Sequence, residues 1–112
     1  MNIELKVNFT NEMLHATSDL LQAVYSPIIS LEKNDKIIRS IGLELAKSFL
    51  SKKEKSIKKA NLLNVKKKAK ITLKYYEAWA LHQIIFELIS LAPDDYTKLQ
   101  LQTTLNKLNE LL

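Results

Sequence analysis

The chain of 112 residues contains no cysteine, a single glycine and only two prolines. Without cysteine it has no disulfide bond, no thiolate metal ligand and no thiol nucleophile. Glycine is the usual residue of tight β-turns and of phosphate-binding loops, so a hairpin protein or a nucleotide-binding loop needs several. Leu and Lys, both good helix formers, are the commonest residues instead. These shortages favour an all-α fold.

The length fits a single domain covering residues 1–112, and an apolar fraction of 46% is typical of globular proteins. The longest nearly apolar run, residues 78–91, is interrupted by His82, Gln83 and Glu87 and is too short to cross a bilayer. The N-terminal residues also lack the uninterrupted apolar core of a secretory signal. We therefore expect a soluble, cytoplasmic protein without a membrane span.

The first nine residues alternate between apolar and polar side chains, with Ile3, Leu5, Val7 and Phe9 on one side. A period of two predicts a half-buried strand, and residues 1–9 therefore form an extended arm. A strand on its own leaves its backbone hydrogen bonds unmet. Three alternatives stay open: pairing with the same strand of a second subunit, lying on the helices as an extended arm, or a frayed terminus.

Four helices are predicted after the arm. Thr10 or Asn11 caps the first, which carries the apolar positions Leu14, Leu21, Tyr25 and Ile28 and must kink or restart at Pro27 before ending near Leu31. Asn34 or Asp35 begins the second, which reaches about Ala60 and carries an apolar stripe of Ile37, Ile38, Ile41, Leu45 and Phe49. Its Gly42 is expected to permit the close approach of a neighbouring helix.

After a break at residues 61–64, the pattern predicts one helix over residues 65–91. Its second half is apolar on nearly every side, so it should be the central helix of the core, with Tyr76, Trp79, Leu81, Ile85 and Leu88 buried. Pro93 ends it. Asp94 and Asp95 then begin a last helix, whose apolar face carries Leu101, Leu105, Leu108 and Leu112.

The predicted fold is therefore an all-α, antiparallel four-helix bundle with a short extended N-terminal arm. Short connections favour antiparallel neighbours. Three helices do not fully cover a central helix that is apolar all round, so we expect a homodimer.

Ten of the seventeen basic side chains fall between residues 52 and 74, where Glu54 is the only acid. We call these lysines the basic cluster; they are Lys52, Lys53, Lys55, Lys58, Lys59, Lys66, Lys67, Lys68, Lys70 and Lys74. If the two halves of the cluster lie on antiparallel helices, the lysines share one end of the bundle. Such a surface is either a solvated helical face or a binding site for nucleic acid, an acidic protein or a membrane surface.

The residue types in the cluster limit what it can recognise. Lysine suits backbone phosphate better than base edges, and Arg39 is the only arginine, so nucleic-acid binding would be nonspecific and salt-dependent. Tyr75 and Tyr76 adjoin the cluster, and an exposed tyrosine there would stack on bases.

Three potential metal ligands, Glu12, His15 and Asp19, share one face of the first helix, and His82 lies far along the chain. A di-iron bundle needs a second Glu-x-x-His step, which is missing. We interpret the three residues as a polar surface stripe and assign no metal ligand, cofactor or catalytic residue. The most apolar helix also carries three polar residues, His82, Gln83 and Glu87. They lie on its solvent-exposed side or face another subunit.

These observations predict a non-enzymatic helical interaction or assembly module that self-associates. The alternative is nonspecific binding of nucleic-acid phosphates through the basic cluster. Helical patterning of this kind is common to many unrelated proteins and carries no function by itself.

Overall fold

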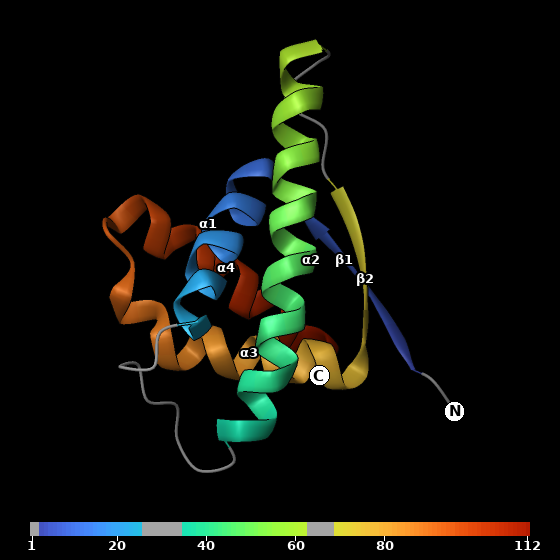
Figure 1. Ribbon diagram of the computed structural model, residues 1–112, viewed down its shortest axis with the longest axis vertical. Coiled ribbons are helices and arrows are strands. Elements are labelled where there is room, and N and C mark those ends of the chain that lie inside the picture. The colour runs from blue at the N-terminus through green and yellow to red at the C-terminus, as the bar shows by residue number, and fades with distance from the viewer. Residues whose placement is uncertain (1–2, 26–34, 63–68) are drawn as a thin grey trace.

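The computed structural model describes residues 3–25, 35–62 and 69–112, except for the side chains of residues 35 and 59–62. These ranges hold four α-helices and two strands (Figure 1). In chain order the elements are β1 (Glu4–Phe9), α1 (Asn11–Leu21), the 3-10 segment η1 (Gln22–Tyr25), α2 (Asp35–Leu62), β2 (Ala69–Lys74), α3 (Tyr75–Leu88), the 3-10 segment η2 (Ile89–Leu91) and α4 (Asp95–Leu111). The fold is an all-α helical bundle with a short extended N-terminal arm, as predicted.

The long helix α2 organises the molecule (Figure 1). It stands along the longest axis, with α1 and α4 on one side and the two strands on the other, while α3 crosses its lower half. Helix α2 packs against both α1 and α3, and α4 packs against α1 and α3. None of the helices in the described ranges is long and apolar enough to span a membrane.

The largest correction concerns residues 65–91, which do not form one helix. Residues 69–74 are the strand β2, and α3 begins only at Tyr75. Lys70, Thr72 and Lys74 are exposed whereas Ile71 and Leu73 are buried, which is the period of two typical of a half-buried strand. The lysines of the basic cluster that the structure describes therefore lie on a helix and a strand, not on two antiparallel helices.

The N-terminal strand is confirmed, and its partner lies in the same chain. Strand β1 pairs antiparallel with β2, with Val7 opposite Ile71 and Asn8 opposite Lys70. The pairing continues past the strand end, because the backbone amide of Tyr75 donates to the carbonyl of Ile3 at 2.9 Å. These backbone groups therefore find partners within the chain, and pairing of the arm with a second subunit is not needed to satisfy them.

Helix α4 contacts β1. The Lys107 ammonium group donates to the backbone carbonyl of Asn8 at 2.8 Å. An exposed strand edge can recruit other chains, and a lysine placed across it discourages this.

The core lies between the inner face of the strands and the four helices. Phe9 of β1 and Phe49 of α2 are fully buried and meet edge to face, with ring centroids 5.6 Å apart. The cluster also contains buried residues of every helix, among them Met13, Leu14, Leu45, Leu81, Ile84, Leu101 and Leu108. Edge-to-face contact is a favoured arrangement of aromatic rings and fixes the arm against α2.

Most helix boundaries agree with the capping signals. Thr10 caps α1 by accepting from the Met13 amide at 3.1 Å, and Asp94 caps α4 by accepting from the Thr97 amide at 2.7 Å. Helix α2 begins at Asp35 as predicted and extends through Leu62. Leu101, Leu105 and Leu108 are buried, whereas Leu112 at the end of that stripe is exposed.

Two predictions for the first half of the chain need correction. The α-helix that Thr10 caps ends at Leu21 and tightens into η1, where Tyr25 is exposed and Val24 is buried in its place. Ile37, predicted on the apolar stripe of α2, is also exposed. The predicted restart at Pro27 and the turn through Leu31 lie outside the described residues. The predicted break at residues 61–64 is wrong for residues 61 and 62, which continue α2, while residues 63 and 64 lie outside the described residues.

Candidate functional site

Helix α3 is covered on one side only. Its buried residues are Ala78, Ala80, Leu81, Ile84, Ile85 and Leu88. On the opposite side, 40% of Trp79 and 65% of Phe86 are exposed to solvent. The sequence predicted a helix buried all round, and Leu81, Ile85 and Leu88 confirm this for one side, whereas Trp79 corrects it for the other. Tyr76, also predicted in the core, is half exposed.

The exposed side carries a continuous row of rings. Tyr75, Trp79, His82 and Phe86 are spaced by four, three and four residues, so they share one face of the helix. We call these four residues the aromatic face. The rings of His82 and Phe86 stack in parallel planes, with centroids 6.5 Å apart. The sequence alone contained this spacing, but nothing in it showed which side of α3 the rest of the chain covers.

The aromatic face borders the C-terminal end of the chain. The hydroxyl of Tyr75 donates to the carbonyl of Leu112 at 3.4 Å, and Leu111 and Leu112 are themselves exposed. Ile3, whose carbonyl accepts from the Tyr75 amide, is exposed as well. Apolar groups from both chain ends therefore adjoin the first turn of α3.

Charged groups flank this face at the two ends of α3. The Lys74 ammonium group lies 5.9 Å from the centroid of the Tyr76 ring, and the Lys74 amide donates to the Glu77 carboxylate at 2.8 Å. At the other end, Oε2 of Glu87 is shielded from solvent and has no hydrogen-bond partner among the described residues. A shielded carboxylate oxygen without a donor is costly.

The structure separates the basic cluster into groups with different partners. Lys53 forms an ion pair with Asp19 of α1, with Nζ and Oδ1 2.6 Å apart, and Lys52 donates to the hydroxyl of Ser48. Lys55 and Lys58 of α2 are exposed, and so are Lys70 and Lys74 of β2. The side chain of Lys59, and Lys66, Lys67 and Lys68 entirely, lie outside what the structure describes.

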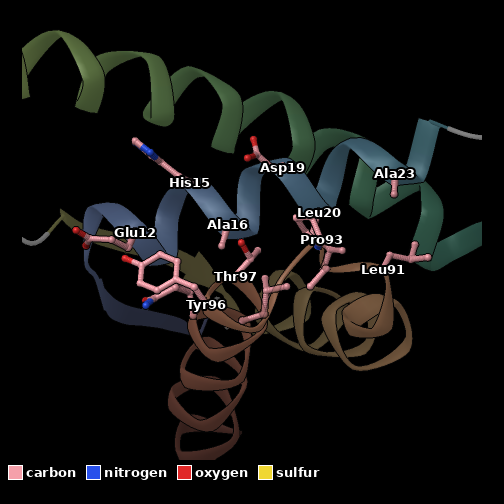
Figure 2. A pocket seen from close by; sticks show the side chains of 13 residues that line it. Glu12, His15, Ala16, Asp19, Leu20, Ala23, Leu91, Pro93, Tyr96 and Thr97 are labelled. Carbon is pink, nitrogen blue, oxygen red and sulfur yellow. The ribbon is translucent and has the colours of Figure 1, made fainter.

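A groove of about 330 Å³ runs between α1 and the start of α4 (Figure 2). Glu12 and Tyr96 lie at one end of it and Ala23 and Leu91 at the other, while the side chain of His15 projects toward α2. A volume of this size is at the lower end of what small-molecule sites occupy. Its lining mixes apolar residues, such as Leu20 and Leu91, with polar residues of α1 and α4.

The predicted polar stripe of α1 lines this groove without forming a metal centre. Glu12, His15 and Asp19 all border it, but Asp19 is bound by Lys53 and His82 belongs to the aromatic face. In the described part of the chain, no group of three His, Asp or Glu side chains is placed to hold a metal ion.

Comparisons with protein-family models, with curated proteins and with solved structures found no match to this chain.

Proposed function

We propose that the chain is a non-enzymatic assembly module that forms a homodimer through the aromatic face of α3. The observation that carries this proposal is the exposure of Trp79 and Phe86 in one row with Tyr75. Aromatic residues are enriched at protein interfaces, and an exposed apolar face larger than scattered single residues marks a contact site. The absence of cysteine suits the reducing cytoplasm, where we propose that it acts.

The size of this face indicates a reversible dimer. Three large aromatic side chains, each about half exposed, offer roughly 300 Å² per copy, well below the ~800 Å² per partner of a standard interface. The exposed Ile3, Leu111 and Leu112 extend the area. We expect a dissociation constant in the micromolar range, on the order of 10 to 100 μM.

Light scattering on size-exclusion fractions tests the proposal. The mass should rise from 12.9 kDa at low concentration toward twice that value as the protein is concentrated. Phe86→Glu should keep the protein monomeric, because it places a charge where each copy buries an aromatic ring of the interface. The substitution should not unfold the chain, since 65% of Phe86 is exposed. Circular dichroism checks this.

The matched control is Tyr96→Glu. Tyr96 is an aromatic residue of α4 with 60% of its surface exposed, and it lines the groove between α1 and α4 (Figure 2). The Tyr96→Glu protein should dimerise like the unmodified chain. A protein that stays monomeric up to about 500 μM, or equal losses in both variants, would overturn the proposal.

A second candidate function is nonspecific binding of nucleic-acid phosphates by the basic cluster. Its support is that Lys55, Lys58 and Lys70 are exposed and have no acidic partner among the described residues. Only six residues separate the end of α2 from the start of β2, so the lysines of both elements border one connection. Flexible ammonium groups of this kind suit phosphate contacts.

A salt titration against a labelled DNA duplex and a single strand tests this candidate. Binding should weaken steeply with salt, in proportion to the phosphates contacted. Lys55→Gln/Lys58→Gln should lose affinity, whereas the control Lys36→Gln/Lys98→Gln, which removes two exposed lysines outside the cluster, should retain more of it. Absence of binding at low salt would exclude nucleic acid and leave the assembly module as the proposed function.

A further inference from the structure

We infer that two copies pair through antiparallel α3 helices, related by a twofold axis that passes between Trp79 and His82. This inference rests on the proposed homodimer and specifies its geometry. In a twofold interface, if residue i contacts residue j of the second copy, then j contacts i. Antiparallel helices about this axis place Tyr75 opposite Phe86 of the second copy and Trp79 opposite His82 of the second copy.

The aromatic face is symmetric about this axis. Its spacing of four, three and four residues reads the same in both directions along α3. When one copy is turned end to end, every ring therefore meets a ring of the other copy. A row of residues at alternating spacings of three and four is also the pattern by which two helices pack along a seam. The pairing consequently leaves no member of the row facing an aliphatic or charged residue.

The charges at the ends of α3 select the antiparallel over the parallel arrangement. Lys74 precedes the helix and Glu87 lies near its end, so thirteen residues separate them. At a rise of 1.5 Å per residue they are about 20 Å apart and cannot pair within one chain. In a parallel dimer each would face its own equivalent, which is repulsive. In the antiparallel dimer, Lys74 of one copy faces Glu87 of the other.

The position of Lys74 supports this pairing. Its ammonium group lies over the ring of Tyr76, and Tyr76 and Glu87 are eleven residues apart, close to three full helical turns. They therefore share one flank of α3, and a twofold axis perpendicular to the helices keeps that flank on the same side of both copies. The ammonium group is thus on the correct side to reach Glu87 of the second copy.

One carboxylate oxygen of Glu87 also lacks a partner in the part of the chain that the structure describes. Its Oε2 is shielded from solvent and accepts no hydrogen bond among the described residues. A shielded oxygen without a donor is energetically costly, so a conformation or a complex that supplies a donor is stabilised. Glu87 as a residue is partly exposed, so rotation of its carboxyl group toward the interface lets a lysine of the second copy supply that donor, and complementary charges at the rim of an interface fix its register.

Charge reversal tests the register. Lys74→Glu alone and Glu87→Lys alone should each weaken the dimer by roughly tenfold, because each places two like-charged pairs across the interface. The double variant Lys74→Glu/Glu87→Lys restores opposite charges and should regain the original dissociation constant. Both substitutions suit the helix dipole, since one adds an acid at the start of α3 and the other a base near its end, so the fold should persist.

Cross-linking provides a second readout, because the chain has no cysteine of its own. A mixture of the Tyr75→Cys and Phe86→Cys proteins should form a mixed disulfide, since these positions face each other across the axis. Either variant alone should cross-link slowly, because a disulfide needs Cα atoms within about 7 Å.

The outcomes separate the inference from the proposal on which it rests. If the unmodified chain never dimerises, the proposed function fails. If it dimerises but the single reversals leave the dissociation constant unchanged, or each cysteine variant cross-links with itself as fast as the mixture, the antiparallel register is wrong and the homodimer stands. Weakening by both single variants, restoration by the double variant and a mixed disulfide together support the register.

Discussion

Gly42 of α2 lies directly against Ile84 of α3. A Cβ atom added to Gly42 would be 2.8 Å from Cδ1 of Ile84 and 3.3 Å from Cγ1 of Val24. These distances are shorter than ordinary van der Waals contacts, so the glycine lets α2 approach α3 and η1. The sequence prediction that Gly42 permits close helix packing is confirmed.

Substitutions at Gly42 should depend strongly on size. Gly42→Ala should change the unfolding free energy by less than about 1 kcal/mol, because the gain in helix propensity offsets the displacement of the flexible Ile84 end. Gly42→Leu should lower it by about 2 kcal/mol or more, since a larger side chain has no space. Urea unfolding measures both. An unfolding free energy for Gly42→Leu equal to that of the unmodified chain would contradict this account.

A double-mutant cycle tests whether Cδ1 of Ile84 is the atom that limits the space for a side chain at position 42. Ile84→Val removes Cδ1. The change in unfolding free energy caused by Gly42→Ala should therefore be more stabilising, by about 0.5 kcal/mol or more, in the Ile84→Val protein than in the unmodified chain. Independent effects of the two substitutions would show that the contact does not limit the packing.

Two buried threonines should respond in opposite directions to the same substitution. Thr17 of α1 and Thr104 of α4 are both fully buried. Within the described ranges the Thr17 hydroxyl has no hydrogen-bond partner, whereas the Thr104 hydroxyl donates to the Gln100 carbonyl at 3.0 Å. Thr17→Val should raise the unfolding free energy by about 1 kcal/mol, and Thr104→Val should lower it by a similar amount. Thermal unfolding of the two variants compares them directly, and equal shifts would argue against this difference.

The cap of α4 predicts a loss of stability in acid. Hydrogen bonds from the backbone and side chain of Thr97 lower the pKa of the Asp94 carboxyl below its usual 3.8. A carboxyl whose pKa is lower in the folded state stabilises the fold fully above pH 3.8 and loses that contribution as the pH falls through the folded pKa. The melting temperature should therefore fall as the pH drops below 3.8, and part of this fall should depend on the Asp94 carboxyl.

Asp94→Asn is the matched control, because asparagine is also a good cap but does not titrate. The difference in melting temperature between the Asp94→Asn protein and the unmodified chain should shrink from pH 6 toward pH 2. A difference that stays constant with pH would show that the carboxylate is not the titrating cap.

The ion pair between Lys53 and Asp19 predicts unequal roles within the basic cluster. Asp19 already compensates the charge of Lys53, whereas Lys58 is exposed without an acidic partner among the described residues. If the cluster binds DNA, Lys58→Gln should lower the affinity about twofold to threefold at low salt, and Lys53→Gln should lower it less. Asp19→Asn should raise the affinity by releasing Lys53. Fluorescence anisotropy with a labelled duplex measures all three, and equal losses at the two lysines would contradict the assignment.

The sequence was informative where local chemistry decides the structure. The alternation at residues 3–9 and the caps at Thr10 and Asp94 each act within a few residues of the chain, and all three are found in the structure. Close helix packing at Gly42 could also be predicted, because a glycine inside the apolar stripe of a helix usually has a packing reason.

Strand β2 could not be found in this way. Residues 69–74 fit both a helix, with Ala69 and Leu73 four positions apart, and a strand, with Ile71 and Leu73 two positions apart. The choice depends on β1, whose backbone groups need a partner and lie about sixty residues earlier in the chain. Tertiary pairing of this kind overrides local propensity.

The aromatic face was hidden for a related reason. Residues 78–91 are apolar almost all round, so periodicity does not distinguish the side facing the core from the side facing solvent. That distinction is set by where α2 and α4 pack on α3.

Fluorescence of Trp79 tests the central claim most directly, because it is the only tryptophan and lies in the middle of the aromatic face. When the protein is concentrated from about 1 to about 500 μM, the emission maximum should move to shorter wavelength and acrylamide quenching should decrease, and Phe86→Glu should abolish both changes. Emission and quenching that stay constant while the mass doubles would place the dimer interface elsewhere. If mass and emission both stay constant over this range, the chain does not associate through α3.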